Sequence, residues 1–416
     1  MSDRGPFALS FRPRGGAGGW GPGSRVGPEA RRKRWMPTLT DVERRARRRV
    51  PGFAFDFVDG GTGEDLGVRR NRAALDGIEI LPRYGEITPP KTEVTLFGDT
   101  YASPTGIAPT GLDGLAWPDA TRRLATTARA ANIPYIAGTL ASASIEEVAQ
   151  LCPGQVWFQL YGMPRDEHRV TFDLVRRADE AGAKALVVAV DAPVRSKRPR
   201  DLRHGLVVPF RPSVRTAFQV ATAPAWALEA ARTRIPVFGN IGRYLGAEPT
   251  LSEVAGFVQN ELRGGFSWED IAALRQAWPR SLVVKGILHP ADAERAVELG
   301  ADGVLVSNHG GRQSDAVPPA VDVLPAIARR VDGAATVLFD SGIRSGLDAA
   351  RALALGADGT FCGRAYLLGL AAAGASGSDY VASMLSEELK TAMGQLGAPS
   401  LKALRGLDVR HPTAWN

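Results

Sequence analysis

Short apolar runs alternate with amphipathic stretches along the chain after about residue 100. The apolar runs are typical of β-strands, and the stretches between them have the period of helices that bury one face. Eight such runs can be counted, at 104–109, 134–138, 155–161, 185–191, 281–285, 302–307, 335–340 and 358–363. Eight repeated βα units predict an α/β protein with a (β/α)8 TIM barrel.

The same pattern divides the rest of the chain. Residues 1–36 are rich in Gly, Pro and Arg with few apolar positions, so we expect a disordered basic tail. Helical patterning then predicts an N-terminal helical extension over 37–100, and the barrel with a C-terminal helix takes 101–416. Residues 192–265 separate the fourth strand from the next expected helix, which is far more than a usual βα loop and indicates an insertion.

Composition excludes several classes of protein. The 416 residues are 44% hydrophobic and 23% charged, and no apolar run approaches the ~18 residues of a membrane-spanning helix. The start of the chain lacks the features of a secretory signal, so we expect a cytoplasmic protein. Cys152 and Cys362 are too few for a disulfide framework and lack metal-ligand spacing, so no metal site is predicted.

Positive charge gathers in two parts of the chain. The basic runs at 31–34 and 44–49 lack aromatic interleaving and any nucleic-acid motif, so no nucleic-acid partner is predicted. The segment from residue 195 to residue 243 contains ten Lys and Arg residues but two acidic residues, and it includes the apolar stretch 217–231. Such a segment can lie on an anionic membrane surface, but a lid or a subunit contact is slightly favoured over it. Peripheral contact through 199–262 at the inner face of the cell membrane is therefore one hypothesis of three.

Polar groups follow nearly every predicted strand, at the end where β/α barrels place their active sites. The seventh and eighth strands end in DSGIRSG and CGRA, two glycine-bearing turns that enter helices. Backbone N–H groups at such turns bind anions, and Arg344 and Arg364 can pair with anion oxygens. The two turns together predict a phosphate site.

The string SNHGGRQ, residues 307–313, is the most specific in the chain. Its spacing lets Arg312 hold a carboxylate while His309 reaches the neighbouring hydroxyl or α-proton. Asp191 follows the fourth apolar run, and we expect it to orient the His309 imidazole and stabilise its protonated form. His289, after the fifth strand, is the rival histidine on the same face.

The chain resembles the FMN-dependent 2-hydroxy-acid oxidases and dehydrogenases in a set of motifs that occur in the same order. These motifs are WFQLY, the stretch from VDAP to RPRD, VVKG, SNHGGRQ, LFDSGIRSG and CGRA. The resemblance runs from about Thr40 to Leu407, and TGLDGLAWP and the long insertion are most similar to the mandelate dehydrogenase branch. It implies an FMN cofactor, a 2-hydroxy acid substrate and an external electron acceptor, either a quinone or dioxygen. We also expect a homo-oligomer, namely a tetramer.

The resemblance also implies a role for each matching residue. His309 would be the base with Asp191 as its partner, Tyr161 would hydrogen-bond the reacting oxygen, and Arg198 and Arg312 would bind the substrate carboxylate. The positions implied to contact FMN are Pro109, Thr110, Gly111, Gly138, Gln159, Lys285, Ser307, Asp340, Gly342, Arg344, Gly363 and Arg364.

Some positions depart from the family pattern. Phe57 replaces a tyrosine that helps to bind the substrate carboxylate, which removes a hydrogen bond typically worth about 1.5–3 kcal/mol. Ala189 and Gly138 replace a threonine and a serine near the flavin. Gly111 stands where many oxidases have alanine and the mandelate branch has glycine, which favours a quinone over dioxygen as acceptor.

The favoured function is oxidation of a large or aromatic, mandelate-like acid, or of a lactate-like acid, to the 2-oxo acid. One alternative is an FMN oxidoreductase acting on a modified peptide or natural-product intermediate, because Phe57 loosens the expected carboxylate site. A second alternative is a non-catalytic flavin-binding protein. The joint presence of five residues argues against it, namely His309, Asp191, Arg198, Arg312 and Lys285.

Overall fold

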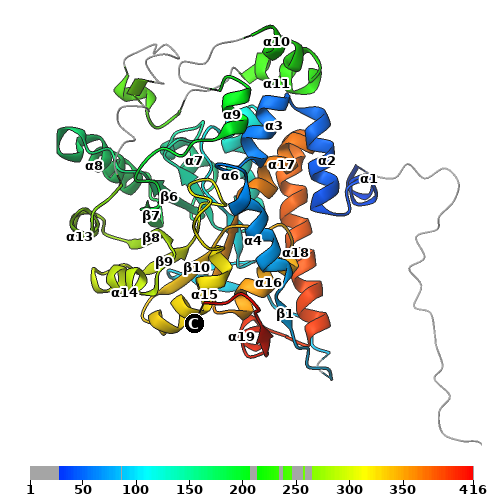
Figure 1. Ribbon diagram of the computed structural model, residues 1–416, viewed down its shortest axis with the longest axis vertical. Helices are drawn as coiled ribbons and strands as arrows, with labels where there is room; N and C mark the ends of the chain where they lie inside the picture. The colour runs from blue at the N-terminus through cyan, green and yellow to red at the C-terminus, as the bar shows by residue number, and fades with distance from the viewer. Residues whose placement is uncertain are drawn as a thin grey trace, which may run out of the picture.

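A computed structural model describes residues 28–85, 87–206, 213–233, 238–245, 256–257 and 265–415 (Figure 1). Eight parallel strands form a closed barrel in the order β10-β11-β4-β5-β6-β7-β8-β9. Their bounds are Thr105–Ile107 (β4), Tyr135–Gly138 (β5), Val156–Leu160 (β6), Ala185–Ala189 (β7), Ser281–Ile287 (β8), Gly303–Val306 (β9), Thr336–Phe339 (β10) and Gly359–Cys362 (β11). Each lies in a run predicted from the sequence, except that β8 continues two residues further. The (β/α)8 barrel is confirmed.

Helices follow the strands and cover the outside of the barrel. They are α5 (Asp113–Ala116), α6 (Ala120–Ala131), α7 (Ile145–Leu151), α8 (Arg165–Glu180), α13 (Trp268–Ala277), α14 (Pro290–Glu298), α15 (Ala320–Val331), α16 (Gly346–Ala354), α17 (Arg364–Ala373), α18 (Gly377–Leu396) and α19 (Leu401–Arg405). The short strands β1 (Glu79–Ile80) and β12 (Val409–Arg410) pair with each other.

Side chains fill the barrel from its amino-terminal end. Trp157 is fully buried, and its Nε1 donates a hydrogen bond of 3.1 Å to the hydroxyl of Tyr101. Tyr101 belongs to the hairpin of β2 (Val94–Leu96) and β3 (Asp99–Tyr101), which packs beneath the barrel. The ring of Phe361 lies 5.4 Å from that of Trp157. The barrel is therefore a packed core, and the chemistry is left to its carboxyl end.

The N-terminal extension lies against α17 and α18 in Figure 1 and contains α2 (Leu39–Arg49), α3 (Gly52–Asp59) and α4 (Leu66–Asp76). Helix α2 begins with a capping box, in which the Thr38 hydroxyl accepts from the Asp41 N–H while the Asp41 carboxylate accepts from the Thr38 N–H. Its apolar face buries Leu39, Val42 and Ala46. The extension positions α3 and α4 beside the mouth of the barrel.

The tail prediction is wrong for residues 28–35, which form helix α1 (Pro28–Trp35), and the rest of the predicted tail up to residue 27 lies outside the described residues. Arg32 donates a hydrogen bond to the Ser376 hydroxyl, and Lys33 pairs with Glu387 at 2.8 Å. These partners are more than 340 residues away, so local composition gave no sign of them.

The insertion after β7 contains helices that the sequence pattern did not predict: α9 (Pro199–Arg203), α10 (Val214–Ala221), α11 (Pro224–Thr233) and the 3-10 turn η1 (Gly242–Tyr244). Helices α10 and α11 dock on α3. The Gln219 side chain accepts a hydrogen bond of 3.0 Å from the Phe53 N–H, and the Trp226 ring packs edge-on against Phe53 at 5.8 Å. The predicted segment 199–262 falls partly outside the described residues.

Candidate functional site

A cavity of about 560 Å³ opens at the carboxyl ends of the barrel strands. Most of the predicted site residues line it, namely Phe57, Pro109, Thr110, Gly111, Gln159, Tyr161, Arg198, Lys285, His309, Arg312, Asp340, Gly342, Arg344, Gly363 and Arg364. The remaining three, Gly138, Asp191 and Ser307, lie behind this lining and contact Thr110, His309 and Lys285 respectively. The structure therefore brings the predicted residues to one place.

His309 is held at both ring nitrogens. Its Nδ1 lies 3.0 Å from Asp191 Oδ2, and its Nε2 lies 3.2 Å from the Tyr161 hydroxyl. An ionised carboxylate only accepts hydrogen bonds, so Asp191 fixes the proton on Nδ1 and leaves Nε2 as the basic nitrogen. The arrangement predicted from the sequence for His309 and Asp191 is present.

The charges around this pair make His309 a neutral base. Burial lowers the pKa of His309 and the neighbouring Lys285 lowers it further, while Asp191 raises it; the net pKa lies below its ordinary value. Burial alone would raise the pKa of Asp191, but the charges of His309 and Lys285 bring it down to about 2. At neutral pH the site therefore holds a carboxylate beside an imidazole that is ready to accept a proton.

Lys285 is a buried cation behind the base. Its Nζ donates a hydrogen bond of 3.0 Å to Ser307 and lies 3.8 Å from Asp191 and 3.6 Å from Asp340. Burial opposes its charge, yet the two carboxylates raise its pKa, so the ammonium stays protonated. A fixed positive charge is thus built into the cavity wall.

The backbone of the His309 loop is strained. His309, Gly310 and Gly311 are three successive residues with positive φ angles of 57°, 64° and 74°. The hydroxyl of Ser341 accepts hydrogen bonds from the Asn308 and Gly310 N–H groups at 3.1 and 3.0 Å. Because the left-handed region is unfavourable for a residue with a side chain, such partners are needed to hold His309 there.

Asn71 fixes the same loop from α4. Its side-chain amide and that of Asn308 exchange two hydrogen bonds of 2.8 Å, and both residues are buried. Sequence reasoning missed both Asn71 and Ser341 as site residues. Ser341 could have been noticed beside Asp340 in DSGIRSG, whereas nothing in the sequence marks Asn71, which lies 237 residues from its partner.

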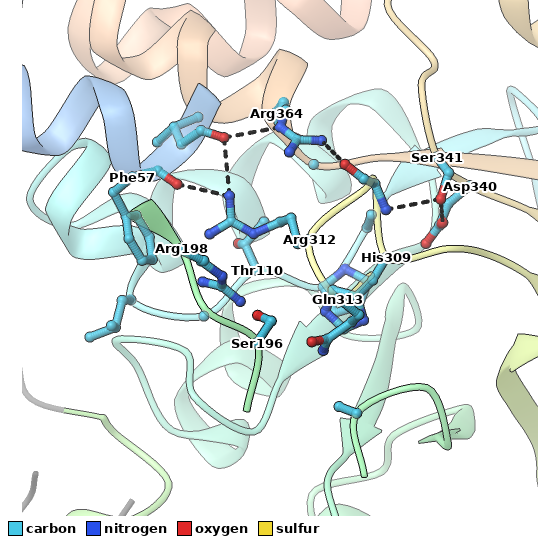
Figure 2. Close-up of a pocket in the computed structure, with 18 of the residues that line it drawn as sticks. Phe57, Thr110, Ser196, Arg198, His309, Arg312, Gln313, Asp340, Ser341 and Arg364 are labelled. Carbon is cyan, nitrogen blue, oxygen red and sulfur yellow. Dashed lines mark hydrogen bonds between the residues drawn. The ribbon is translucent and has the colours of Figure 1, made fainter. Parts of the chain in front are cut away.

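Two arginines face His309 across the cavity (Figure 2). Arg312 Nη1 donates to the carbonyls of Phe57 and Gly60 at 2.9 and 2.7 Å, and its guanidinium lies over the Phe57 ring. The Arg198 guanidinium makes no hydrogen bond within the described part of the chain, and its Nε is buried. Burial lowers the pKa of both groups, and in Arg312 the charge of Arg198 adds to the effect. An anion bound between the two guanidinium groups would stabilise their charged forms and so counter the lowered pKa of each.

The two arginines that the sequence predicts for the phosphate both have protein partners. Arg364 donates to the carbonyls of Val58, Gly60 and Gly310 at 2.7–3.0 Å, and Arg344 pairs with Glu43 at 2.8 Å and Asp59 at 3.6 Å. Burial and the charge of Arg344 lower the pKa of Arg364 to about 10. The positive charge here fits a phosphate, and the phosphate site itself stays a prediction.

Several unpaired groups suit a flavin. Gln159 Nε2 and Thr110 Oγ1 are buried at the cavity with no hydrogen-bond partner among the described residues. A buried donor without a partner is costly, so each calls for a polar edge such as that of an isoalloxazine ring. A Cβ on Gly363 would meet Thr110 Cγ2 at 3.0 Å, so this wall leaves little room for a side chain. The residues present therefore fit FMN.

The rival histidine has another task. His289 caps α14, where its Nδ1 accepts a hydrogen bond of 3.1 Å from the Ala291 N–H, and it does not line the cavity. In the described residues, no group of His, Cys, Asp and Glu side chains could hold a metal ion.

Residues 46–411 match the FMN-dependent dehydrogenase family. The chain belongs to this family. FMN is therefore its cofactor and oxidoreduction its class of reaction, as the resemblance implied.

Similar proteins carry two kinds of name. The L-lactate dehydrogenases of Pectobacterium atrosepticum and Yersinia pestis are each 39% identical to this chain, covering 87% and 86% of it and 94% of their own length. A mandelate oxidase solved with (S)-4-hydroxymandelic acid is 37% identical with a TM-score of 0.79. The monotopic membrane protein (S)-mandelate dehydrogenase is 32% identical with a TM-score of 0.85. Both structures match over 90% of this chain and 99% of theirs.

Proposed function

We propose that this protein oxidises a 2-hydroxy acid to the 2-oxo acid, with His309 as the base and Arg198 and Arg312 as the carboxylate ligands. The observation that carries the proposal is the cavity in which two half-buried guanidinium groups face a neutral, carboxylate-oriented imidazole. FMN, when bound, supplies the acceptor for the two electrons that leave the substrate.

The protein's own residues perform the remaining tasks. Arg198 and Arg312 neutralise the substrate carboxylate and fix the adjacent carbon, which is a gain in both charge and orientation. His309 Nε2 accepts a proton from the hydroxyl or from the carbon that bears it, and Asp191 stabilises the resulting imidazolium. Tyr161, next to Nε2, can donate a hydrogen bond to the reacting oxygen, because burial raises the pKa of its hydroxyl.

The apolar residues that line the cavity favour a substrate with an apolar side chain. Carbon-rich side chains from the loops after β4 and β5 and from the insertion after β7 line it, namely Leu112, Leu140, Val194, Leu206 and Phe238. A phenyl ring would bury more apolar area there than a methyl group, so we favour a mandelate-like acid over a lactate-like one. Both types of acid occur in the names of similar proteins.

Anaerobic mixing with mandelate, lactate and glycolate tests this function, because flavin absorbance bleaches only when a substrate is oxidised. Mandelate should bleach the FMN fastest. Arg198→Met is the matched control, since it keeps the flavin site and loses one carboxylate ligand. FMN-loaded protein that no 2-hydroxy acid bleaches would contradict the proposal and favour a modified peptide or natural-product substrate, or a non-catalytic flavin protein.

For the electron acceptor we propose a quinone. Support comes from Gly111, whose added Cβ would lie 3.0 Å from the Cβ of Leu140, so even alanine would crowd this part of the flavin wall. Reoxidation of the reduced protein should be faster with a soluble quinone analogue than with air. Rapid peroxide release in air, with no gain from the quinone, would overturn this assignment.

We also propose that the insertion lies on the inner face of the cell membrane, where a quinone would be found. In the described residues no helix is long and apolar enough to cross a bilayer. Helices α10 and α11 instead expose Val214 (89%), Phe218 (69%) and Leu228 (53%), beside the exposed Arg215 and Arg232. Apolar side chains among cations are typical of a surface that binds anionic lipid.

Pelleting with anionic vesicles at low salt tests the membrane contact. The protein should pellet, and Val214→Ser with Phe218→Ser should release it while leaving flavin bleaching unchanged. Failure of the unaltered protein to pellet would leave the lid or a contact between subunits as the role of the insertion. Light scattering would then test the homo-tetramer that we propose as the oligomeric state.

A further inference from the structure

The short helix α9 carries Arg198 at its N-terminal end but has little of its own to hold it in place. It spans five residues, Pro199–Arg203, and none of them is buried. An isolated helix of this length is unstable in water, so its position must come from contacts with the rest of the protein. The guanidinium of Arg198 has no hydrogen bond in the described part of the chain and cannot supply them.

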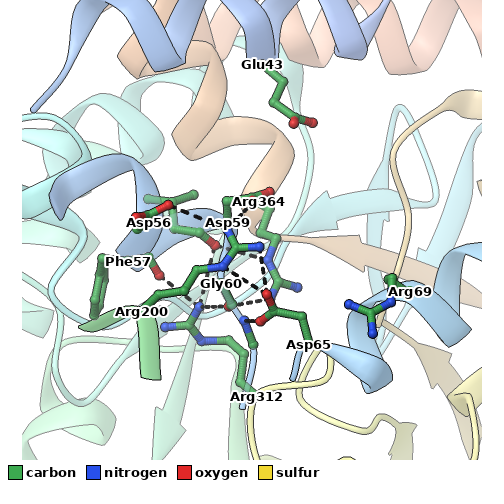
Figure 3. A network of polar contacts seen from close by, with 12 residues as sticks. Glu43, Asp56, Phe57, Asp59, Gly60, Asp65, Arg69, Arg200, Arg312 and Arg364 are labelled. Carbon is green, nitrogen blue, oxygen red and sulfur yellow. Dashed lines mark hydrogen bonds and ion pairs between the residues drawn. The ribbon is translucent and has the colours of Figure 1, made fainter. Parts of the chain in front are cut away.

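Arg200 supplies the strongest of these contacts (Figure 3). Its Nη1 lies 2.7 Å from Asp59 Oδ2, and its Nη2 lies 2.6 Å from Asp65 Oδ2, to which its Nε also donates at 2.9 Å. Asp56 lies 3.5 Å from the same guanidinium and also binds His204 at 2.7 Å. One side chain of α9 thus joins three carboxylates at the end of α3 and the start of α4.

The segment 56–65 also holds the chain on the N-terminal side of Arg198. The Thr62 hydroxyl donates to the Lys197 carbonyl at 2.8 Å, and the Gly63 N–H donates to it at 3.3 Å. Residues 197 and 200 are therefore both attached to the segment 56–65. Between them, the backbone of Arg198 has little freedom.

This segment also sets the position of the second carboxylate ligand. Arg312 donates to the carbonyl of Gly60, next to Asp59, which binds Arg200. A Cβ on Gly60 would lie 3.1 Å from Arg200 Cδ, so glycine permits this close approach. Both guanidinium groups that face the substrate are therefore placed relative to one short stretch of backbone.

We propose that Arg200 is a positioning residue for substrate binding. It acts through the segment 56–65 and sets the distance between the guanidinium groups of Arg198 and Arg312. The inference rests on the proposed function, because it needs a substrate with a carboxylate. Arg200 itself does not line the cavity and touches no reacting atom.

A purely stabilising role makes a different prediction. Arg200 is 29% exposed, and ion pairs near the surface contribute little to the free energy of unfolding. A displacement of about 1 Å in a substrate ligand, in contrast, can lower kcat/KM on the order of a hundredfold. Loss of Arg200 should therefore affect carboxylate binding far more than stability, because His204 still attaches α9 to α3.

The test compares Arg200→Met and Arg200→Lys with the unaltered, FMN-loaded protein. Arg122→Met is the control, since Arg122 is 38% exposed, pairs with Asp119 and Glu147, and lies outside the cavity. Steady-state KM and kcat are measured with mandelate. Flavin difference spectra give the dissociation constants of phenylglyoxylate, which carries a carboxylate, and of the neutral mandelamide.

Arg200→Met should raise KM for mandelate and the dissociation constant of phenylglyoxylate on the order of tenfold or more, with a smaller change in kcat. Mandelamide binding should change little, Arg200→Lys should recover part of the loss, and Arg122→Met should bind like the unaltered protein. Equal weakening of acid and amide, or a lower melting temperature with unchanged KM, would overturn the role of Arg200. Failure of mandelate, lactate and glycolate to bleach the unaltered protein would instead count against the proposed function.

Discussion

The base His309 and the carboxylate ligand Arg198 are held in different ways. His309 follows a barrel strand, both of its ring nitrogens have partners, and Asn308 beside it is bonded to Asn71 and Ser341. Arg198 directly precedes a five-residue helix with no buried side chain, and its guanidinium has no hydrogen bond among the described residues.

This difference means that proton transfer by His309 and substrate selection by Arg198 depend on different parts of the molecule. Groups that move protons need fixed geometry, which the ends of barrel strands provide. Arg198, which would help to select the substrate, lies in an insertion, where the sequence can change without disturbing the barrel. Substitution of His309 should therefore lower the rate of flavin reduction, whereas substitution of Arg198 should mainly raise KM.

The largest effect is expected from His309→Gln. Removal of the base should lower the rate constant of flavin reduction on the order of a thousandfold, because general-base catalysis contributes about that much. The FMN content and the dissociation constant of the 2-oxo acid should change little. Stopped-flow reduction under anaerobic conditions measures the rate, and a variant that still reduces its flavin within tenfold of normal would show that His309 is not the base.

On the other side of the cavity, Arg198→Met should act mainly on binding. Loss of one charge-assisted hydrogen bond, about 1.5–3 kcal/mol, raises KM for the acid on the order of ten- to a hundredfold. Added guanidinium ion should restore part of the activity, because the open side of the cavity can admit it. If kcat fell as far as in His309→Gln with KM unchanged, the separation of the two sides would be wrong.

The pH dependence of kcat/KM reports on the base alone. His309 acts in its neutral form, and burial places its pKa below the ordinary 6.5. Activity should therefore stay level as the pH falls to about 6.5 and then drop about tenfold per unit below the pKa of His309. An acid limb centred above pH 6.5 in a full pH profile would contradict the lowered pKa.

Phe57→Tyr should give the smallest change. Phe57 and Arg312 both line the cavity, with the Arg312 guanidinium 5.2 Å from the centre of the Phe57 ring, so a tyrosine here would bring a hydroxyl close to the carboxylate ligands. One added hydrogen bond should lower KM for the acid about three- to tenfold and leave kcat near its present value. A higher KM would mean that the phenylalanine makes room for the substrate instead.

Periodicity and motifs were enough to predict the barrel and the base. Each of the eight strands is an apolar run bounded by turns, and His309 lies in a local string whose spacing carries its chemistry. The helices of the insertion were missed because they depend on α3, more than 140 residues earlier. Asn71 and Arg200 were missed for the same reason, since each acts through a partner that is distant in sequence.

The most direct measurement is the yield of 2-oxo acid in a single anaerobic turnover. Protein loaded with FMN is mixed with excess mandelate, and the product is counted against the flavin that bleaches. The account predicts one 2-oxo acid for each flavin reduced, and almost none from His309→Gln on the same timescale. Bleaching without any 2-oxo acid, or the same yield and rate from His309→Gln, would contradict it.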